Sequence, residues 1–269
     1  MLVFRQFSRG LDLLSLLTLL VLAGCGPLRT EATRTAESSQ AKQPPRASQA
    51  AAPAKPAKPT KPRRPTAEEI SHQYLPLHPV PRDEAEKRIV AVLEDLYTNK
   101  PEGMGNILPE DGRLLRMLAE TLGAQHVVDV GTANGYSAIW LCLALRSTGG
   151  RLTTYEIDPD RIALAQENFR RAGVEPLVTL VAGDAHQTLQ QLSGPIDLVL
   201  IDAEKEGFAD YLQQLLPLVR TGGLILGHDS STHAHLMEDY FRAIAEHPDL
   251  ETVFVDASRC GMCLSRKMR

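Results

Sequence analysis

Short apolar runs alternate with helical patterns from about residue 83 to the end of the chain. The run from Ile196 to Ile201, IDLVLI, is almost wholly apolar, as a strand covered on both faces should be. Between such runs, apolar residues recur at helical spacing, for example from Phe208 to Val219. This alternation predicts an α/β fold, with a parallel sheet and helices on both of its faces.

Polar and glycine residues follow the predicted strands, at the point where each strand ends. In parallel sheets of this type, ligands bind outside the carboxyl ends of the strands. Five such positions carry residues suited to ligand binding: 131–137, Glu156, Asp184, 202–205 and 227–230. The sequence therefore predicts one ligand site at this edge of the sheet.

The stretch VVDVGTANGYS joins the first buried strand to a helix. It lacks the G-x-G-x-x-G spacing of nicotinamide and flavin sites, because Gly131 and Gly135 are four residues apart. The pattern D-x-G-x-A-x-G that begins at Asp129 instead resembles the first motif of class I S-adenosylmethionine-dependent methyltransferases. That resemblance implies that the glycines let the backbone approach the amino-acid part of S-adenosylmethionine. Ser137, at the start of the helix, would offer its hydroxyl and amide to the methionine carboxylate.

Two carboxylates at the ends of the next strands complete the expected cofactor site. Glu156 ends the second strand, where a carboxylate can accept two hydrogen bonds from ribose hydroxyls. Asp184 ends the third strand in AGDA and would face the adenine amino group, with Ala185 beside it. A glycine pair or a single Glu alone is a weak signal, but these residues in this order favour a methyltransferase.

Longer stretches resemble the cation-dependent O-methyltransferases, which include catechol and caffeoyl-coenzyme A O-methyltransferases. The similar segments run from about Gly105 to Arg269 and include GNILPEDGRLLRML, YEIDPDRIALAQENFRRAG, IDLVLIDAEKEGFADYL, GGLILGHDS and GMCLSRK. The resemblance implies a Rossmann-like sheet of seven strands, mostly parallel, with an antiparallel last strand. It also implies methyl transfer from S-adenosylmethionine to a hydroxyl of a small, catechol-like acceptor. Homodimerisation is expected on the same ground.

In that family, an Asp after the fourth strand and an Asp-Asn pair after the fifth hold a divalent metal. The first corresponds to Asp202, the pair corresponds to Asp229 and Ser230, and Lys205 matches the family's lysine. Adjacent strands lie ~4.8 Å apart, so the two carboxylates could share Mg²⁺ or another divalent cation. Lys205 would act as the general base and Asp202 would place the cation beside the acceptor, so both are expected to be catalytic.

Ser230 stands where the family has Asn, and a hydroxyl is a poorer metal ligand than an amide carbonyl. Glu204 and His228 are therefore candidates for another ligand. Asp202 and Asp229 could instead cap helices. Two further interpretations stay open: a metal-independent methyltransferase acting on another acceptor, and a cofactor-binding lipoprotein without turnover.

The N-terminus has the features of a bacterial lipoprotein signal. Arg5 and Arg9 precede a short apolar run that ends in LAGC. The run is too short for a comfortable membrane span and is typical of a signal peptide. LAGC resembles the lipobox, which implies a signal peptide over 1–24 and lipidation of Cys25. We expect a membrane-anchored lipoprotein facing the periplasm or the cell exterior; an uncleaved anchor that holds the domain in the cytoplasm stays open.

Charge separates the rest of the chain into a basic linker and an acidic domain. The linker, 25–66, is rich in Pro, Ala and Lys and has too little apolar side chain to fold. Residues 29–66 carry a net charge of +7, which leaves −12 for the expected methyltransferase domain over 67–269. An acidic domain argues against nucleic acid as a partner, whereas the basic linker could lie on an anionic membrane surface.

Overall fold

The structure describes residues 63–269 in a computed structural model of the chain. The expected signal peptide, Cys25 and nearly all of the expected linker lie outside the described residues. Within the described part, no helix is long and apolar enough to cross a membrane.

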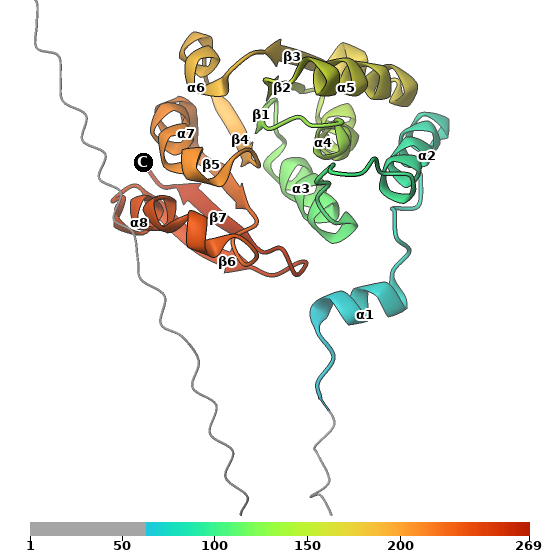
Figure 1. The fold of residues 1–269 in the computed structure, drawn as a ribbon, viewed down its shortest axis with the longest axis horizontal. Coiled ribbons are helices and arrows are strands. Elements are labelled where there is room, and N and C mark those ends of the chain that lie inside the picture. The colour runs from blue at the N-terminus through green and yellow to red at the C-terminus, as the bar shows by residue number, and fades with distance from the viewer. Residues whose placement is uncertain (1–62) are drawn as a thin grey trace, which may run out of the picture. The chain divides into compact units, whose positions relative to one another are not determined.

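A seven-stranded sheet forms the centre of the described fold (Figure 1). Its strand order is β3-β2-β1-β4-β5-β7-β6, and β7 runs antiparallel to both of its neighbours, whereas the other pairs are parallel. The strands are β1 (His126–Val130), β2 (Arg151–Glu156), β3 (Val178–Ala182), β4 (Ile196–Ile201), β5 (Val219–His228), β6 (Leu250–Val255) and β7 (Met262–Lys267). The predicted mostly parallel sheet with an antiparallel last strand is confirmed.

Helices cover both faces of the sheet, and each face has its own apolar core (Figure 1). One core is formed with α2 (Glu84–Thr98), α3 (Pro109–Leu122), α4 (Tyr136–Thr148) and α5 (Pro159–Ala172). The other is formed with α6 (Ala185–Thr188), α7 (Phe208–Leu215) and α8 (Glu238–Glu246), while α1 (Ala67–Tyr74) comes first in the described chain. A short 3₁₀ helix, Ala234–Leu236, precedes α8.

The register of the central strands aligns their carboxyl ends. Val130 of β1 lies beside Ile201 of β4, which in turn lies beside Gly227 of β5. The residues that follow these strands therefore emerge together at one edge of the sheet. The chain order also reverses between β1 and β4, which is where ligands bind in open α/β sheets.

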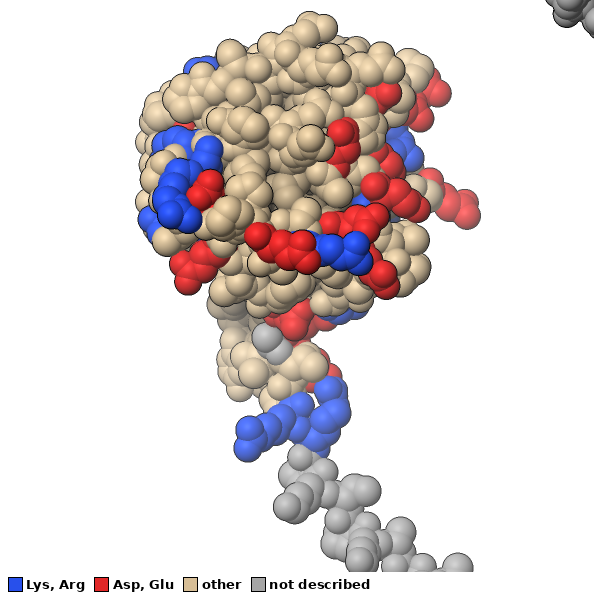
Figure 2. Space-filling model, turned by 90° about the vertical axis from the view of Figure 1, so that its left-hand side faces the viewer, with Lys and Arg blue, Asp and Glu red and all other residues tan. Residues whose placement is uncertain are grey.

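The charged side chains on the surface of the domain are consistent with the net charge counted from the sequence. Figure 2 shows acidic side chains mainly over the right and lower parts of one face, a group of basic side chains at its left edge, and another group where the described chain begins. This distribution agrees with the net charge of −12 carried by residues 67–269. A polyanion would meet repulsion over much of this face.

A buried histidine packs the segment between α1 and α2 against α4. His78 is 4% exposed, stacks on the Trp140 ring, and has its Nε2 3.2 Å from the Tyr136 hydroxyl. Burial, followed by the positive charge of Arg113, lowers the pKa of His78 to about 4. The folded domain therefore keeps this ring neutral at pH values where the unfolded chain would protonate it.

We expect His78→Gln to reduce the loss of stability on acidification. Because the folded pKa lies below the unfolded one, His78 contributes stability that is present above pH ~6.5 and is lost as the pH falls. Between pH 7 and pH 5, the wild type should lose about 1–2 kcal/mol more free energy of unfolding than the variant. Urea denaturation at both pH values measures this difference. His235→Gln, which changes an exposed histidine, is the control; equal losses in wild type and His78→Gln would contradict the assignment.

Candidate functional site

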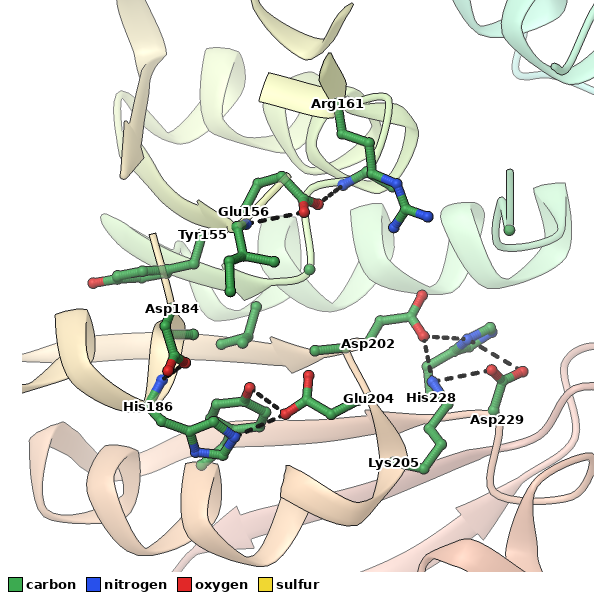
Figure 3. Close-up of a pocket in the computed structure, with 18 of the residues that line it drawn as sticks. Tyr155, Glu156, Arg161, Asp184, His186, Asp202, Glu204, Lys205, His228 and Asp229 are labelled. Atoms are coloured by element: carbon green, nitrogen blue, oxygen red, sulfur yellow. Dashed lines mark hydrogen bonds and ion pairs between the residues drawn. The ribbon is translucent and has the colours of Figure 1, made fainter. Parts of the chain in front are cut away.

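A cavity of about 750 Å³ opens at the carboxyl edge of the sheet. Its wall is built from residues at the ends of β1 to β5 and from the loop before α3. Figure 3 shows polar side chains from several of these strand ends pointing into it. The expected site residues that line the cavity are Gly131, Glu156, Asp184, Ala185, Asp202, Lys205 and Asp229. Those in the described part that do not line it are Asp129, Gly135, Ser137 and Ser230.

The turn after β1 passes very close to the end of β4. Gly131 has φ = +104°, and a Cβ built on it would lie 2.5 Å from the carbonyl oxygen of Asp202. Both the backbone conformation and the lack of space therefore require glycine here. Gly135 is similar, because it has φ = +87° and a Cβ on it would lie 2.6 Å from the Phe169 ring. The two glycines let the turn pack tightly against the protein, so that its backbone can face the cavity.

Asp129 and Ser137 stabilise this turn from behind the cavity wall, where neither residue lines the cavity. The Ser137 hydroxyl donates to Asp129 Oδ2 at 3.1 Å, and the Thr154 hydroxyl donates to the same oxygen at 3.2 Å. Burial, followed by the nearby charge of Asp202, raises the pKa of Asp129 to about 7. Because the Ser137 hydroxyl bonds Asp129 here, its expected contact with a methionine carboxylate stays a prediction.

Glu156 lies at the rim of the cavity, where backbone N–H groups fix its carboxylate. Its Oε2 accepts the N–H of Ala133 at 2.8 Å. Its Oε1 accepts the N–H groups of Ile157 and Asp158, both at 3.0 Å. A carboxylate has about four acceptor positions, so room remains for a ligand hydroxyl. The expected ribose contact is compatible with this geometry and stays a prediction.

Asp184 lies where β3 leads into α6, and beside it is a network that sequence reasoning missed. Asp184 caps α6 by accepting the N–H of His186 at 3.0 Å. The His186 ring bonds Asp210 through Nδ1 and Glu204 through Nε2, and Glu204 also accepts the Tyr211 hydroxyl. The bond to Asp210, together with that to Glu204, raises the pKa of His186 against the effect of burial. No spacing in the sequence links these residues, which come from α6, α7 and the turn before it.

Asp202 and Asp229 lie together at the ends of the adjacent strands β4 and β5 (Figure 3). Lys205 Nζ lies between them, 2.9 Å from Asp202 Oδ1 and 3.1 Å from Asp229 Oδ2. The three side chains are 15%, 18% and 10% exposed in the order Asp202, Asp229, Lys205. Asp229 also has φ = +67°, a conformation that is uncommon for residues other than glycine. Backbone strain at a position that aims a carboxylate into a cavity points to a functional role.

His228, the last residue of β5, connects this pair to a third carboxylate. Its Nδ1 is 3.1 Å from Asp202 Oδ1, and its Nε2 is 3.2 Å from Asp111 Oδ2. Asp111, in the first turn of α3, is fully buried and also accepts the Ser258 hydroxyl at 2.6 Å. The sequence assigned no role to Asp111 or Ser258, because nothing in the pattern connects them to the end of β5.

Opposite charges stabilise this cluster. Burial alone would raise the pKa of Asp202, but His228 and then Lys205 lower it to about 2. Burial alone would lower the pKa values of His228 and Lys205, but contacts led by Asp202 raise both. The structure therefore holds the Asp202 carboxylate ionised against an ammonium and an imidazolium group.

Three donor atoms in the cluster fit a divalent cation. Asp202, His228 and Asp229 each offer one ligand atom, and these atoms lie within 4.8 Å of one another. Ser230, the third ligand that the family resemblance implies, is 6% exposed and does not line the cavity. The residues present thus suit a cation, with oxygen and nitrogen donors, but the resemblance alone does not identify the third ligand.

A family model described as "O-methyltransferase" matches residues 82–267. A catechol O-methyltransferase from Niastella koreensis is 40% identical over 125 residues, which cover 45% of this chain and 56% of that protein. One from Mycobacterium tuberculosis is 35% identical over 160 residues, covering 54% of this chain and 71% of that protein. The solved structure of cofactor-bound Rv0187 from MTB has 28% identity and a TM-score of 0.63, covering 76% of this chain and 99% of that one. The match therefore spans little more than half of the Niastella protein.

We expect Gly131→Ala to destabilise the domain by about 2 kcal/mol or more, since the new methyl group would require a strained φ and overlap the Asp202 carbonyl. Urea denaturation measures the effect. The control is Gly105→Ala, at another cavity-lining glycine, where a Cβ would meet no atom within 4 Å. It should change the free energy of unfolding by less than ~1 kcal/mol. Equal stability of the two variants would mean that the turn and the end of β4 are not in contact.

Proposed function

The chain belongs to the O-methyltransferase family, and on that basis we propose that it transfers a methyl group from S-adenosylmethionine to a hydroxyl of a small acceptor. One observation carries the proposal: a single cavity holds Glu156 and Asp184 at one part of its wall and Asp202, Lys205 and Asp229 at another. The first part suits a nucleoside and the second suits an acidic hydroxyl. We propose a catechol-like aromatic acceptor, which the names of the two curated relatives support.

The arrangement of the cavity wall supports one orientation of the cofactor. In the proposed complex, the ribose and adenine lie near Glu156 and Asp184, and the amino-acid part lies over the glycine turn. Because Gly131 packs against the end of β4, this orientation brings the sulfonium close to Asp202. The methyl group would then face the part of the cavity that contains Lys205 and Asp229.

Lys205 is the proposed general base. Lys205 is an ammonium beside the acidic pair, so it must first release one proton to solvent. The neutral amine then accepts the proton of the acceptor hydroxyl as the oxygen bonds the methyl carbon and the carbon–sulfur bond breaks, which leaves S-adenosylhomocysteine. A divalent cation held by Asp202 and Asp229 would lower the pKa of the acceptor hydroxyl and would compete for the carboxylates that hold the Lys205 ammonium. Alignment of acceptor and donor in one cavity would supply much of the acceleration.

A metal-independent methyltransferase is the second candidate. It is supported by Lys205 and His228, which already neutralise the acidic pair through side chains of the protein itself. Calorimetry with S-adenosylmethionine, followed by a methylation assay on catechol with divalent cation or with chelator, separates the candidates. Turnover that the chelator abolishes supports the metal-dependent reaction, and turnover indifferent to chelator supports the second candidate. No heat of cofactor binding would refute both.

We expect Lys205→Met to lower the rate of methyl transfer about 10²–10⁴-fold, the usual contribution of a general base. The dissociation constant of S-adenosylmethionine should change little, because Lys205 acts on the acceptor. Single-turnover methylation and calorimetry measure the two quantities. The control is Lys87→Met, which removes an exposed lysine from α2 and should leave both unchanged. A Lys205→Met protein that retained full activity would exclude the residue as the base.

We also propose that a lipid on Cys25 tethers the domain to a bacterial membrane, on the periplasmic or external side, through the basic linker. The LAGC sequence and the short apolar run before it support this proposal. Labelled palmitate should be incorporated into the wild type and not into Cys25→Ser. Label retained in the variant would refute lipidation at this cysteine, and a Cys142→Ser variant serves as a matched cysteine control.

A further inference from the structure

We infer that the divalent-cation site of this chain takes its third protein ligand from His228 and not from Ser230. Two carboxylates and one imidazole would then hold the ion, a set that favours a transition metal such as Mn²⁺ or Co²⁺ over Mg²⁺. The inference deepens the proposed function and rests on it only for the expectation that a cation binds here.

The donor atoms have the spacing that a single ion requires. Two ligands about 2.1 Å from an ion and at right angles to each other lie about 3.0 Å apart. His228 Nδ1 is 3.1 Å from Asp202 Oδ1 and 3.6 Å from Asp229 Oδ1. All three residues line the cavity, so an acceptor in the cavity could reach an ion that they hold.

The other nitrogen of the His228 ring makes the contact that metal-bound histidines usually make. Such a histidine donates its second N–H to a carboxylate, which fixes the ring and raises its basicity. His228 Nε2 is 3.2 Å from Asp111 Oδ2, and Asp111 is fully buried and held by the Ser258 hydroxyl. An ion that binds at Nδ1 must displace the proton that Nδ1 carries in the imidazolium form. Nε2–H would then still donate to Asp111, and the lone pair of Nδ1 would be directed toward the acidic pair.

The other two candidate ligands are placed less favourably. Ser230 is 6% exposed and does not line the cavity. Glu204 uses Oε1 to accept the Tyr211 hydroxyl and to bond His186 Nε2. Of the three candidates, His228 is therefore the one that contacts the acidic pair.

Two neighbouring side chains, His233 and Cys260, could also bind a cation near this cluster, so the experiment must exclude each of them. His233, which is 47% exposed, has its Nδ1 3.4 Å from Asp229 Oδ2 and could present a different imidazole. Cys260 forms a second possible ligand set with Asp111 and His228, also within 4.8 Å. An ion in that set would be bound by a thiolate, which gives cobalt complexes a characteristic charge-transfer absorption.

Pulsed electron paramagnetic resonance of the Mn²⁺-loaded protein tests the ligand directly, because it detects a nitrogen bound to the ion. We expect coupling to a bound imidazole nitrogen in the wild type and in the controls His233→Gln and Ser230→Ala. The coupling should be lost in His228→Gln, and the preference for Mn²⁺ over Mg²⁺ should fall at least ~10-fold. Asp111→Asn should keep the coupling but weaken Mn²⁺ binding about 10–100-fold.

Several results would overturn the inference. These are a wild-type Mn²⁺ site without nitrogen coupling, no Mn²⁺ binding at millimolar concentration, and coupling that persists in His228→Gln or disappears in His233→Gln. A cobalt–thiolate absorption band that Cys260→Ser abolishes would place the ion in the other ligand set and would also overturn it. The wild type, His233→Gln and the cobalt spectrum decide the question even if His228→Gln does not fold.

Calorimetry with S-adenosylmethionine separates failure of this inference from failure of the proposed function. Unchanged cofactor heat in His228→Gln would show that the variant is folded and that only the cation site has changed. If the wild type bound Mn²⁺ through a nitrogen but bound no S-adenosylmethionine, the proposed function would fail while the ligand assignment stood.

Discussion

Two largely buried carboxyl groups cannot both stay ionised side by side unless positive charge neutralises them. Asp202 and Asp229 meet this condition through Lys205, whose Nζ is 2.9 and 3.1 Å from them, and through His228. Removing each charge from water costs several kcal/mol, so the cluster depends on the nearly complete set of bonds around it. Lys205 and His228 thus already contact the acidic pair, and any cation that enters must compete with these groups of the protein.

The sheet brings these groups together through its strand order and register. β4 and β5 are adjacent and in register, so the residues after them emerge ~4.8 Å apart. β1 lies on the other side of β4, and for this reason the glycine turn and Asp202 share one edge. The first turn of α3 then supplies Asp111 from one face of the sheet. The two apolar cores hold the strands in place, and the strands in turn determine where the side chains at their ends lie.

The fold and the acidic residues at the strand ends were predictable because both follow from local pattern. Apolar runs identify buried strands, and the rule for carboxyl edges identifies the residues that follow them. The partners of His228 were not predictable, since Asp111 is 117 residues from it in the chain and Ser258 is 147 residues from Asp111. The direction of the Ser230 side chain could not be predicted either, because Ser230 follows Asp229, whose φ of +67° no sequence pattern indicates. Matching positions to a family motif shows which residue occupies a position but not where its side chain points.

The contact between Gly131 and the Asp202 carbonyl has a consequence for how two ligands would behave together. The space between the turn and the end of β4 is too small for one methyl group, so the two segments are in direct contact at the wall of one cavity. If an occupant of the turn displaced Gly131, the end of β4 and with it Asp202 would have to move as well. Thermodynamic reciprocity then requires an ion at the pair to alter affinity at the turn by the same factor.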